Sequence, residues 1–378
     1  MNIGFDAKRA FYNNTGLGNY SRDTIRILSK YFPENNYFLY SPKAIDNDRL
    51  TFLHQDNIFV KTPNRIIDKS LKSLWRTSAI KRDLSKDNIE IYHGLSHELP
   101  IGIEKTNIKS IVTIHDLIFL RYPQFFRAID NKIYYQKFYH SCKVADKIIA
   151  VSEQTKKDII DFFKINPEKI EVVYQGCNEA FKETQPLEVF DLIRKKHRLA
   201  HNYLLYVGSI EERKNLLTIL KCLKDLPNQN LLIIGNGKEY KNKCLDYIKS
   251  NKLESRVTIL SGLSLQELAG IYQNAQMLIY PSLFEGFGIP IIEALFCKTP
   301  VITSKNGCFS ESGGPSSIYI EPTNTNQMRE AILSILNDEE KRKKQIEIGF
   351  KHAQKFNDNI IAKKLTSTYR DLKNARRN

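Results

Sequence analysis

The sequence contains no run of the roughly 18 consecutive apolar residues that a transmembrane helix requires. Residues 1–6 also lack the basic stretch and the following apolar stretch of a secretory signal, and they have the pattern of a buried first strand. These two absences predict a cytoplasmic protein rather than an integral membrane protein or a secreted one.

Cysteines are few and irregularly spaced. The six of them form no C-x-x-C pair, and their spacing matches no zinc module. We therefore expect buried free thiols in a reducing compartment, and no bound metal.

Positive charge is in excess, and it lies at the two ends of the chain, which has a formal net charge of +15. Residues 1–150 contain 23 Lys and Arg against 15 Asp and Glu, residues 151–350 contain 26 against 25, and residues 351–378 contain 8 against 2. A basic excess attracts nucleic acid or an anionic membrane surface. No nucleic-acid recognition motif accompanies it, so nucleic acid is not an expected partner.

Short β-branched and aromatic runs alternate with helical patterns along the chain. One series of six candidate strands begins at residues 2–5 and ends at 170–173, and a second series of six begins at 203–207 and ends at 318–320. Such alternation predicts an α/β fold, in which helices cover both faces of parallel sheets. Two series predict two doubly wound domains, with the boundary in the polar stretch 181–202.

The most informative motif follows the candidate strand that ends at Tyr280. Residues 281–290 read Pro-Ser-Leu-Phe-Glu-Gly-Phe-Gly-Ile-Pro, and Glu293 follows inside the next helix. Open α/β sheets bind ligands at the carboxyl ends of their strands, and the start of a helix there can hold an anion. Glu285 and Glu293 can accept hydrogen bonds from sugar hydroxyls, or they can merely complement the helix dipole.

A second motif follows the strand that ends at Val207 and reads Gly-Ser-Ile-Glu-Glu-Arg-Lys-Asn-Leu over residues 208–216. Arg213 offers a bidentate fork and Lys214 a point charge, so the pair can neutralise a diphosphate. The alternative is a solvated basic pair.

Two further motifs lie in the N-terminal half. His115 and Asp116 end a candidate strand, where a lone histidine is often only structural. Gly16 and Gly18 follow the first strand, but they lack the third glycine of a dinucleotide-binding loop.

Together these strings resemble the E-x7-E signature and the accompanying motifs of glycosyltransferase family 4. The family pattern Pro-Ser-x-x-Glu-Gly-Phe-Gly-x-Pro-x-x-Glu-Ala is matched here, and Pro-Val-Ile follows at residues 300–302. The resemblance extends over nearly the whole chain. It implies the GT-B fold, in which two Rossmann-like domains face a central cleft and the last helix crosses back to the N-terminal domain. The domains would be residues 1–185, joined by 356–378, and residues 186–355.

The resemblance also implies roles for single residues. The catalytic group near the donor sugar would be His115, Asp116 and Glu285. The donor-binding group would be Gly16, Gly18, Arg213, Lys214, Gly262, Leu263, Gly286, Phe287, Gly288 and Glu293. Relatives often have Asn-Gly-Val-Asp where this chain has Gln-Gly-Cys-Asn at residues 175–178, which leaves the role of Gln175 open.

The implied activity is that of a retaining, metal-independent hexosyltransferase without a cofactor. The first donor hypothesis is GDP-mannose and the second a UDP-hexose, with a glycan or lipid-linked acceptor in the synthesis of a surface polysaccharide such as lipopolysaccharide. Two alternatives are a GT-B epimerase without an acceptor and a non-catalytic sugar-nucleotide-binding protein. The complete set of Arg213, Lys214, Glu285 and Glu293 favours catalysis of transfer.

One short motif is typical of a different glycosyltransferase fold. Residues 46–48, Asp-Asn-Asp, resemble the D-x-D metal site of a different glycosyltransferase fold. They lie in a polar stretch outside the E-x7-E half, so we expect a solvated loop.

Residues 66–84 have interfacial character. Apolar Ile67, Leu71, Leu74 and Trp75 recur at helical spacing among basic residues that include Arg76. The pattern predicts a helix that lies in the headgroup region, with the protein peripheral on the cytoplasmic face of the inner membrane. The alternative is a core-facing helix with solvated lysines.

Overall fold

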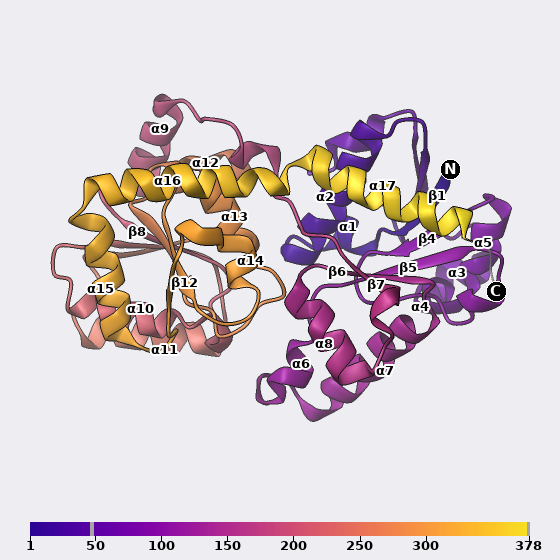
Figure 1. Ribbon diagram of the computed structural model, residues 1–378, viewed down its shortest axis with the longest axis horizontal. Coiled ribbons are helices and arrows are strands. Elements are labelled where there is room, and N and C mark those ends of the chain that lie inside the picture. Colours follow the sequence, from indigo (N-terminus) through magenta and orange to yellow (C-terminus); the bar gives the residue numbers. More distant parts are fainter. Residues whose placement is uncertain (46–48, 376–378) are drawn as a thin grey trace. The chain divides into compact units, whose positions relative to one another are not determined.

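The computed structural model describes residues 1–45 and 49–375 (Figure 1). The chain divides into two compact units. The first unit consists of Met1–Gly176 and Asn357–Asn378, and the second of Cys177–Phe356.

The first unit is built on a parallel sheet that has seven strands among the described residues, in the order β3-β2-β1-β4-β5-β6-β7. The strands are β1 (Asn2–Asp6), β2 (Asn36–Tyr40), β3 (Ile58–Lys61), β4 (Ile91–Gly94), β5 (Lys109–Ile114), β6 (Lys147–Ala150) and β7 (Ile170–Val172). The sequence pattern predicted six of them and missed β3. This strand lies at the sheet edge with Phe59 and Val60 exposed, so its sequence lacks the run of buried residues typical of a central strand.

The second unit has a six-stranded parallel sheet within the described residues, in the order β10-β9-β8-β11-β12-β13. The strands are β8 (Leu204–Val207), β9 (Leu231–Ile234), β10 (Val257–Leu260), β11 (Met277–Tyr280), β12 (Val301–Ser304) and β13 (Ile318–Ile320). The strand order reverses between β8 and β11, so the loops that follow these two strands begin side by side. Both motifs of the second unit lie on those loops.

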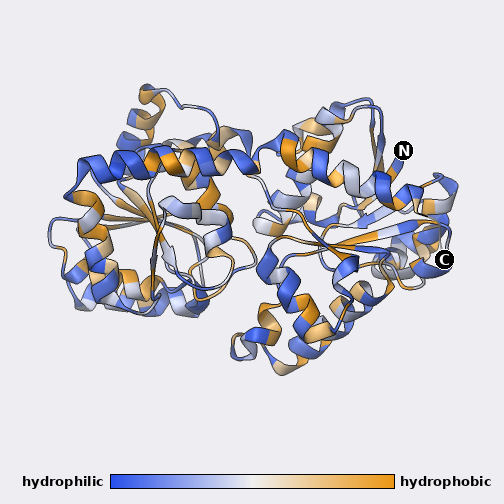
Figure 2. Ribbon diagram, in the orientation of Figure 1, coloured by the Kyte–Doolittle hydropathy of each residue, from blue (hydrophilic) through white to orange (hydrophobic). Residues whose placement is uncertain are grey.

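Helices flank each sheet. Those of the first unit are α1 (Lys8–Tyr12), α2 (Gly16–Tyr31), α3 (Ile66–Ser70), α4 (Lys72–Leu74), α5 (Lys81–Lys86), α6 (Ile118–Arg121), α7 (Ala128–Val144), α8 (Glu153–Phe163) and α17 (Asp358–Asn374). Those of the second are α9 (Leu187–His197), α10 (Leu216–Lys224), α11 (Glu239–Ser250), α12 (Leu265–Gln273), α13 (Ile289–Phe296), α14 (Phe309–Gly313), α15 (Thr325–Leu336) and α16 (Glu339–Ala353). Figure 2 shows that apolar residues are concentrated in the strands, whereas polar residues line the outer helices. Across residues 1–45 and 49–375, no helix combines the length and the apolarity that crossing a membrane requires.

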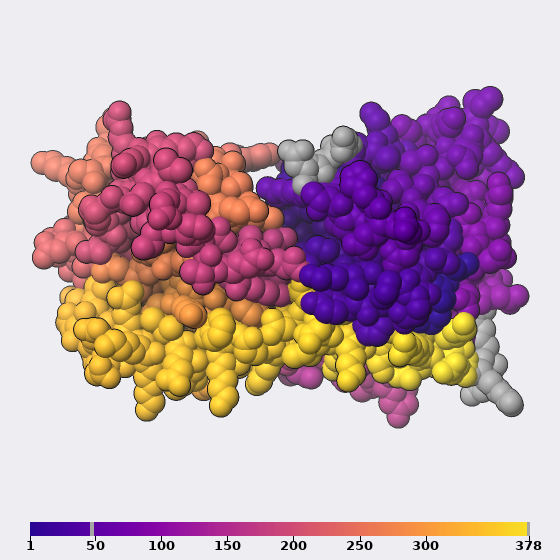
Figure 3. All heavy atoms as spheres, turned by 90° about the horizontal axis from the view of Figure 1, so that it is seen from above, coloured from indigo at the N-terminus to yellow at the C-terminus, as the bar shows by residue number. Residues whose placement is uncertain are grey.

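The C-terminal helix α17 belongs to the first unit, as the resemblance implied. It packs along α2, and Figure 3 shows its yellow residues against the indigo residues of the N-terminal part. Asp358, at the start of α17, lies 2.9 Å from the guanidinium of Arg26 on α2. Further along α17, the buried hydroxyl of Tyr369 lies 2.7 Å from Nδ1 of His93 on β4. Helix α17 is therefore joined to the N-terminal segment of this unit through the core of the unit.

The first unit ends at Gly176, before the boundary predicted after residue 185. The ring of Phe181 contacts Tyr272 of α12 at 5.7 Å between centroids, and the thiol of Cys297 donates to the Phe181 carbonyl oxygen. These contacts attach the intervening residues to the second unit. All six cysteines are buried free thiols, as their spacing predicted.

Candidate active site

The Arg-Lys motif and the E-x7-E motif meet at the switch point of the second sheet. The loop after β8 leads into a short 3-10 turn, Glu212–Lys214, and the loop after β11 runs beside it. The amide N–H of Leu283 donates to the carbonyl oxygen of Arg213 at 2.8 Å, and Nη1 of Arg213 donates to that of Phe284 at 2.7 Å. Motifs that are far apart in the sequence thus share one edge of the sheet.

Glu285 lies between the two cations, and we call Glu285, Arg213 and Lys214 the Glu285 cluster. Its Oε1 is 2.8 Å from Nη1 of Arg213 and 2.5 Å from Nζ of Lys214. Nζ of Lys214 also donates to the hydroxyl of Tyr280 at 2.6 Å. Glu285 and Lys214 are both buried, so their charges interact with little solvent screening.

Electrostatics keep this cluster charged. Burial by itself raises the pKa of Glu285, but the charges of Arg213 and Lys214 outweigh it and lower the pKa to about 2. For Lys214, burial lowers the pKa and Glu285 opposes that shift. Two cations face one buried carboxylate, with Glu211 as a more exposed second partner of Arg213 at 2.9 Å. The three members of the cluster alone have a net charge of +1, which Glu211 offsets when it is counted, and their two cations offer the fork and the point charge that a diphosphate can bind.

The glycine-rich segment after Glu285 leads into helix α13. Gly288 precedes that helix with a φ of +99°, a left-handed conformation that favours glycine, and an added Cβ would lie 3.2 Å from Oγ of Ser312. The first N–H groups of α13 lie beyond it, at the switch-point edge, where an anion can bind. Gly286 and buried Phe287 complete the segment, and the Phe287 ring contacts Phe356 at 5.5 Å between centroids.

Glu293 lies in the second turn of α13 and is buried. Its Oε2 accepts a hydrogen bond from the hydroxyl of Tyr272 at 2.9 Å. Gly262 and Leu263 follow β10, where Gly262 has a φ of +75°. Strand β10 is separated from β8 by β9, so the two residues do not adjoin the Glu285 cluster in the sheet order.

In the first unit, His115 follows β5 and is held by two neighbours. Its Nε2 is 2.9 Å from the carbonyl oxygen of Leu95, and its Nδ1 is 3.3 Å from the side-chain nitrogen of Gln175. Because a carbonyl only accepts and an amide nitrogen only donates, the proton lies on Nε2. Burial lowers the pKa of His115 to about 4, and the nearby charge of Arg9 adds to this effect. The imidazole is therefore neutral at pH 7, with its Nε2 proton directed at the carbonyl oxygen of Leu95.

Several aromatic rings surround His115, and the sequence did not reveal them. Tyr20 of α2 meets it edge-on at 4.5 Å, and His97 lies 5.1 Å away between ring centroids. His97 has a φ of +65°, which is uncommon for a residue other than glycine, and its ring stacks on Phe138 of α7 at 4.2 Å. An isolated histidine in a loop carries no motif, so only its position in the fold identifies it.

The other N-terminal candidates are Gly16, Gly18 and Asp116, and their contacts are with nearby residues. An added Cβ on Gly18 would lie 1.7 Å from the carbonyl oxygen of Asn13, whereas one on Gly16 would meet nothing within 4 Å. Gly18 is therefore required by the tight turn into α2. Oδ1 of Asp116 accepts from the amide N–H of Ile118 at 3.2 Å, at the start of α6.

The interfacial helix predicted over residues 66–84 is wrong in part. The segment is broken into α3, α4, a π-helical turn at Trp75–Ala79 and α5. Trp75 is buried and its indole N–H donates to Asp83, while Arg76 is paired with Asp6 and Glu98. Exposed apolar side chains do remain, and we call them the apolar patch: Ile66, Ile67, Leu71 and Leu74.

The D-x-D string at residues 46–48 lies outside the described residues. In the part of the chain that is described, no group of three or more His, Cys, Asp or Glu side chains is arranged to hold a metal ion.

Two family models of glycosyltransferases match this chain. Residues 189–352 match the family model described as glycosyl transferases group 1, and residues 37–181 match the model of glycosyltransferase family 4. The chain is similar to O-antigen chain mannosyltransferase B of Escherichia coli, with 26% identity over 94% of this chain and 96% of that protein. The chain belongs to glycosyltransferase family 4.

One further sequence and two solved structures are also similar to this glycosyltransferase. O-antigen chain mannosyltransferase RfbU of Salmonella typhimurium is 31% identical over 63% of each chain. Sucrose-phosphate synthase of Thermosynechococcus elongatus superposes over 98% of this chain and 99% of its own, with a TM-score of 0.80 and 20% identity. WaaG, a glycosyltransferase involved in lipopolysaccharide biosynthesis, covers 97% of this chain and 99% of its own, with a TM-score of 0.72 and 15% identity. These structures show the fold, and the prediction of two Rossmann-like units is confirmed.

Proposed function

We propose that this glycosyltransferase moves a hexose, with mannose as the first hypothesis, from a nucleoside-diphosphate sugar to a glycan or lipid-linked acceptor. The donor would be GDP-mannose, or a UDP-hexose in second place, and the product would be part of a surface polysaccharide. The names of two similar proteins, both O-antigen mannosyltransferases, support the choice of mannose. The observation that carries the proposal is the Glu285 cluster at the switch point of the second sheet.

Each member of the cluster has a distinct task in this proposal. Arg213 and Lys214 bind the donor diphosphate and stabilise the charge that develops as it leaves. Glu285 holds both cations in place and accepts a hydrogen bond from the donor sugar. The first N–H groups of α13 add positive potential, so the leaving group requires no metal ion.

Retention of configuration follows if the acceptor attacks from the face that the diphosphate leaves. The bond between C1 and the phosphate oxygen breaks, and a bond between C1 and the acceptor oxygen forms. The acceptor proton passes to the departing phosphate. In this proposal His115, whose imidazole is neutral at pH 7, positions groups near the donor.

Donor binding and transfer are tested separately. A nucleotide sugar that binds the native state raises the Tm, so a thermal-shift screen of GDP- and UDP-sugars identifies the donor. Transfer is then measured with that donor and octyl α-D-mannopyranoside as a simple lipid-linked acceptor. Turnover of the donor without an acceptor would favour the epimerase, and binding without any turnover would favour the non-catalytic protein.

We further propose that the first unit rests on an anionic membrane through the apolar patch. Ile66 and Ile67 are 83% and 71% exposed, and Leu71 and Leu74 are 51% and 56% exposed. Exposed Lys69 and Lys72 lie between them in the sequence. Each basic group near an anionic surface adds about 1 kcal/mol, and buried apolar side chains add to this.

Vesicle flotation tests the membrane contact. Binding should appear with anionic vesicles, weaken as salt rises, and fall in an Ile67→Ser/Leu71→Ser variant. The matched control is Leu187→Ser/Leu192→Ser on α9 of the other unit, since those leucines are 71% and 68% exposed. Equal recovery of all three proteins would count against docking through the apolar patch.

A further inference from the structure

The loop that follows β4, residues 95–98, holds His115 at three places. The carbonyl oxygen of Leu95 accepts a hydrogen bond from Nε2 of His115 at 2.9 Å. Nδ1 of His97 accepts one from the backbone N–H of His115 at 3.5 Å, and the two rings lie 5.1 Å apart between centroids. Both the side chain and the backbone of His115 are therefore positioned by the 95–98 loop.

The 95–98 loop has an unfavourable backbone conformation. His97 has a φ of +65°, in the left-handed region that residues other than glycine rarely adopt. The loop also closes tightly on the strand, because a Cβ added to Gly94 would lie 2.1 Å from the carbonyl oxygen of Glu98. Strained residues persist only where the surrounding contacts hold them, and they are frequent at active sites. The loop therefore depends on the contacts that it makes with the rest of the unit.

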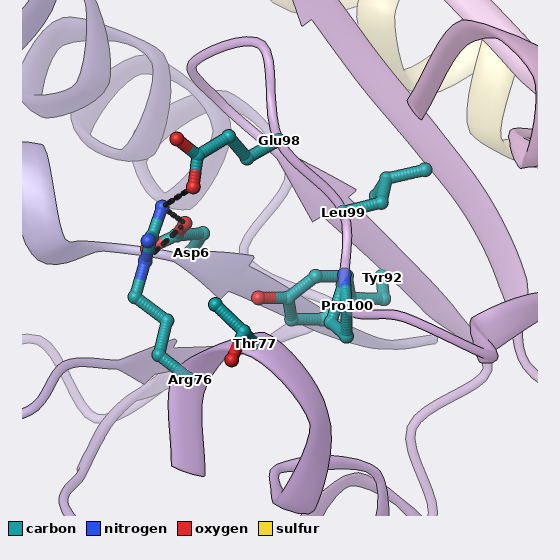
Figure 4. Close-up of a pocket in the computed structure, with 7 residues that line it drawn as sticks. All are labelled: Asp6, Arg76, Thr77, Tyr92, Glu98, Leu99 and Pro100. Atoms are coloured by element: carbon teal, nitrogen blue, oxygen red, sulfur yellow. Dashed lines mark hydrogen bonds and ion pairs between the residues drawn. The ribbon is translucent and has the colours of Figure 1, made fainter. Parts of the chain in front are cut away.

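Arg76 makes a charged contact with the end of this loop, and Figure 4 shows its guanidinium between Asp6 and Glu98. Nη2 of Arg76 lies 2.8 Å from Oδ2 of Asp6, the last residue of β1, and 2.8 Å from Oε2 of Glu98. We call Arg76, Asp6 and Glu98 the Arg76 bridge. The bridge ties the end of the 95–98 loop to strand β1.

The Arg76 bridge is largely buried. The side chains of Arg76 and Asp6 are 14% and 6% exposed, so their charges are little screened by solvent. Burial by itself lowers the pKa of Arg76, but Asp6 and Glu98 outweigh it and raise the pKa above its usual value. Lys137 of α7 also contacts Glu98, at 3.1 Å, but it is 48% exposed, and exposed ion pairs contribute little. Arg76 is therefore the cation that fixes the position of Glu98.

Arg76 itself lies on an unusual element. It belongs to the π-helical turn Trp75–Ala79, and such single turns are rare and frequently lie at functional sites. Two uncommon backbone conformations, this turn and the left-handed His97, are thus joined by one buried ion pair at the loop that holds His115. A contact that served stability alone would require neither of them.

We propose that Arg76 is a positioning residue for His115, and that it acts through Glu98 and the 95–98 loop. With the bridge in place, the carbonyl oxygen of Leu95 and the ring of His97 hold the imidazole in one orientation. Without it, the loop is free to leave its left-handed conformation, and His115 loses both contacts. The consequence for transfer rests on the proposed function, in which His115 lies near the donor sugar.

The test is Glu98→Gln, which removes the charge that pairs with Arg76 and keeps the pair of Arg76 with Asp6, so the variant should fold. Exchange of the His115 amide with deuterated solvent, measured by NMR, should accelerate about tenfold or more, because a charge-assisted hydrogen bond no longer holds the loop. With the donor and octyl α-D-mannopyranoside, kcat should fall about 10- to 100-fold, since a small misplacement of a site residue is sufficient for such a loss. The KM for the donor should change less than about twofold, because Arg213 and Lys214 are unaffected.

Asp358→Asn is the matched control. Asp358 is 7% exposed and lies 2.9 Å from the guanidinium of Arg26, so this variant also removes one buried charge from an ion pair of the first unit. It should lower the Tm without changing kcat or the exchange of the His115 amide, because that exchange occurs by local opening of the loop.

The outcomes separate the bridge from the proposed function. Equal His115 exchange in the wild type and Glu98→Gln overturns the bridge as a positioning device, and faster exchange with an unchanged kcat overturns its role in transfer. Equal acceleration in Glu98→Gln and Asp358→Asn also overturns the proposal, since the effect would then be one of stability. Faster exchange in Glu98→Gln alone, together with no transfer by the wild type from any GDP- or UDP-sugar, supports the bridge and overturns the proposed reaction.

Discussion

Replacing Glu285 with glutamine removes one negative charge from between Arg213 and Lys214 and changes the shape of the side chain very little. In the wild type, Oε1 of Glu285 lies 2.8 Å from Nη1 of Arg213 and 2.5 Å from Nζ of Lys214. Hydrogen bonds to charged groups contribute about 1.5–3 kcal/mol each, and breaking a buried ion pair costs about 3–5 kcal/mol. We expect the free energy of unfolding to fall by about 3 kcal/mol at pH 7, and kcat/KM to fall roughly 10- to 150-fold.

The stabilisation by Glu285 depends on pH. Burial raises its pKa, yet Arg213 and Lys214 outweigh burial and lower the pKa from 4.5 to about 2. A carboxyl group whose pKa is lower in the folded state stabilises the protein above its unfolded pKa, and this contribution is lost as the pH falls through the folded pKa. The difference in Tm between the wild type and Glu285→Gln should therefore be larger at pH 7 than at pH 3.

The control is Glu211→Gln, because Glu211 also pairs with Arg213 but is 48% exposed. Exposed ion pairs contribute about 1 kcal/mol or less, so this variant should keep most of its Tm and activity. Near-normal turnover by a folded Glu285→Gln variant would refute the role of the cluster in transfer. A Tm difference that stays the same from pH 7 to pH 3 would refute the electrostatic explanation.

Three further results are expected. Gln175→Glu places a carboxylate beside His115 and should raise the histidine pKa from about 4, as measured by NMR titration; an unchanged pKa would disprove the contact. Transfer should survive EDTA, and loss of activity that Mg²⁺ or Mn²⁺ restores would overturn the metal-free mechanism. Gly18→Ala should lower the Tm because the added Cβ would lie 1.7 Å from the carbonyl oxygen of Asn13, whereas Gly16→Ala has free space and should keep the Tm of the wild type; equal Tm values for the two variants would contradict this explanation.

Local patterns in the sequence were sufficient to predict most of the strands and the two-unit α/β architecture. Buried central strands such as β8 and β11 have continuous apolar runs, and the glycine and proline residues around Glu285 mark a strand-to-helix turn without any knowledge of distant contacts. These signals depend on neighbours in the chain, so they were readable from the sequence. The exposed edge strand β3 lacks such a run and was missed.

Tertiary structure decided which side chains act together. The pairing of β8 with β11 brings Arg213 and Lys214 to Glu285, and the burial of that group sets its charge state. The contact of Gln175 with His115 and the burial of Trp75 likewise depend on segments that are distant in the sequence. Desolvation and Coulomb interactions are set by distances in space, and a one-dimensional pattern specifies those distances only through the fold.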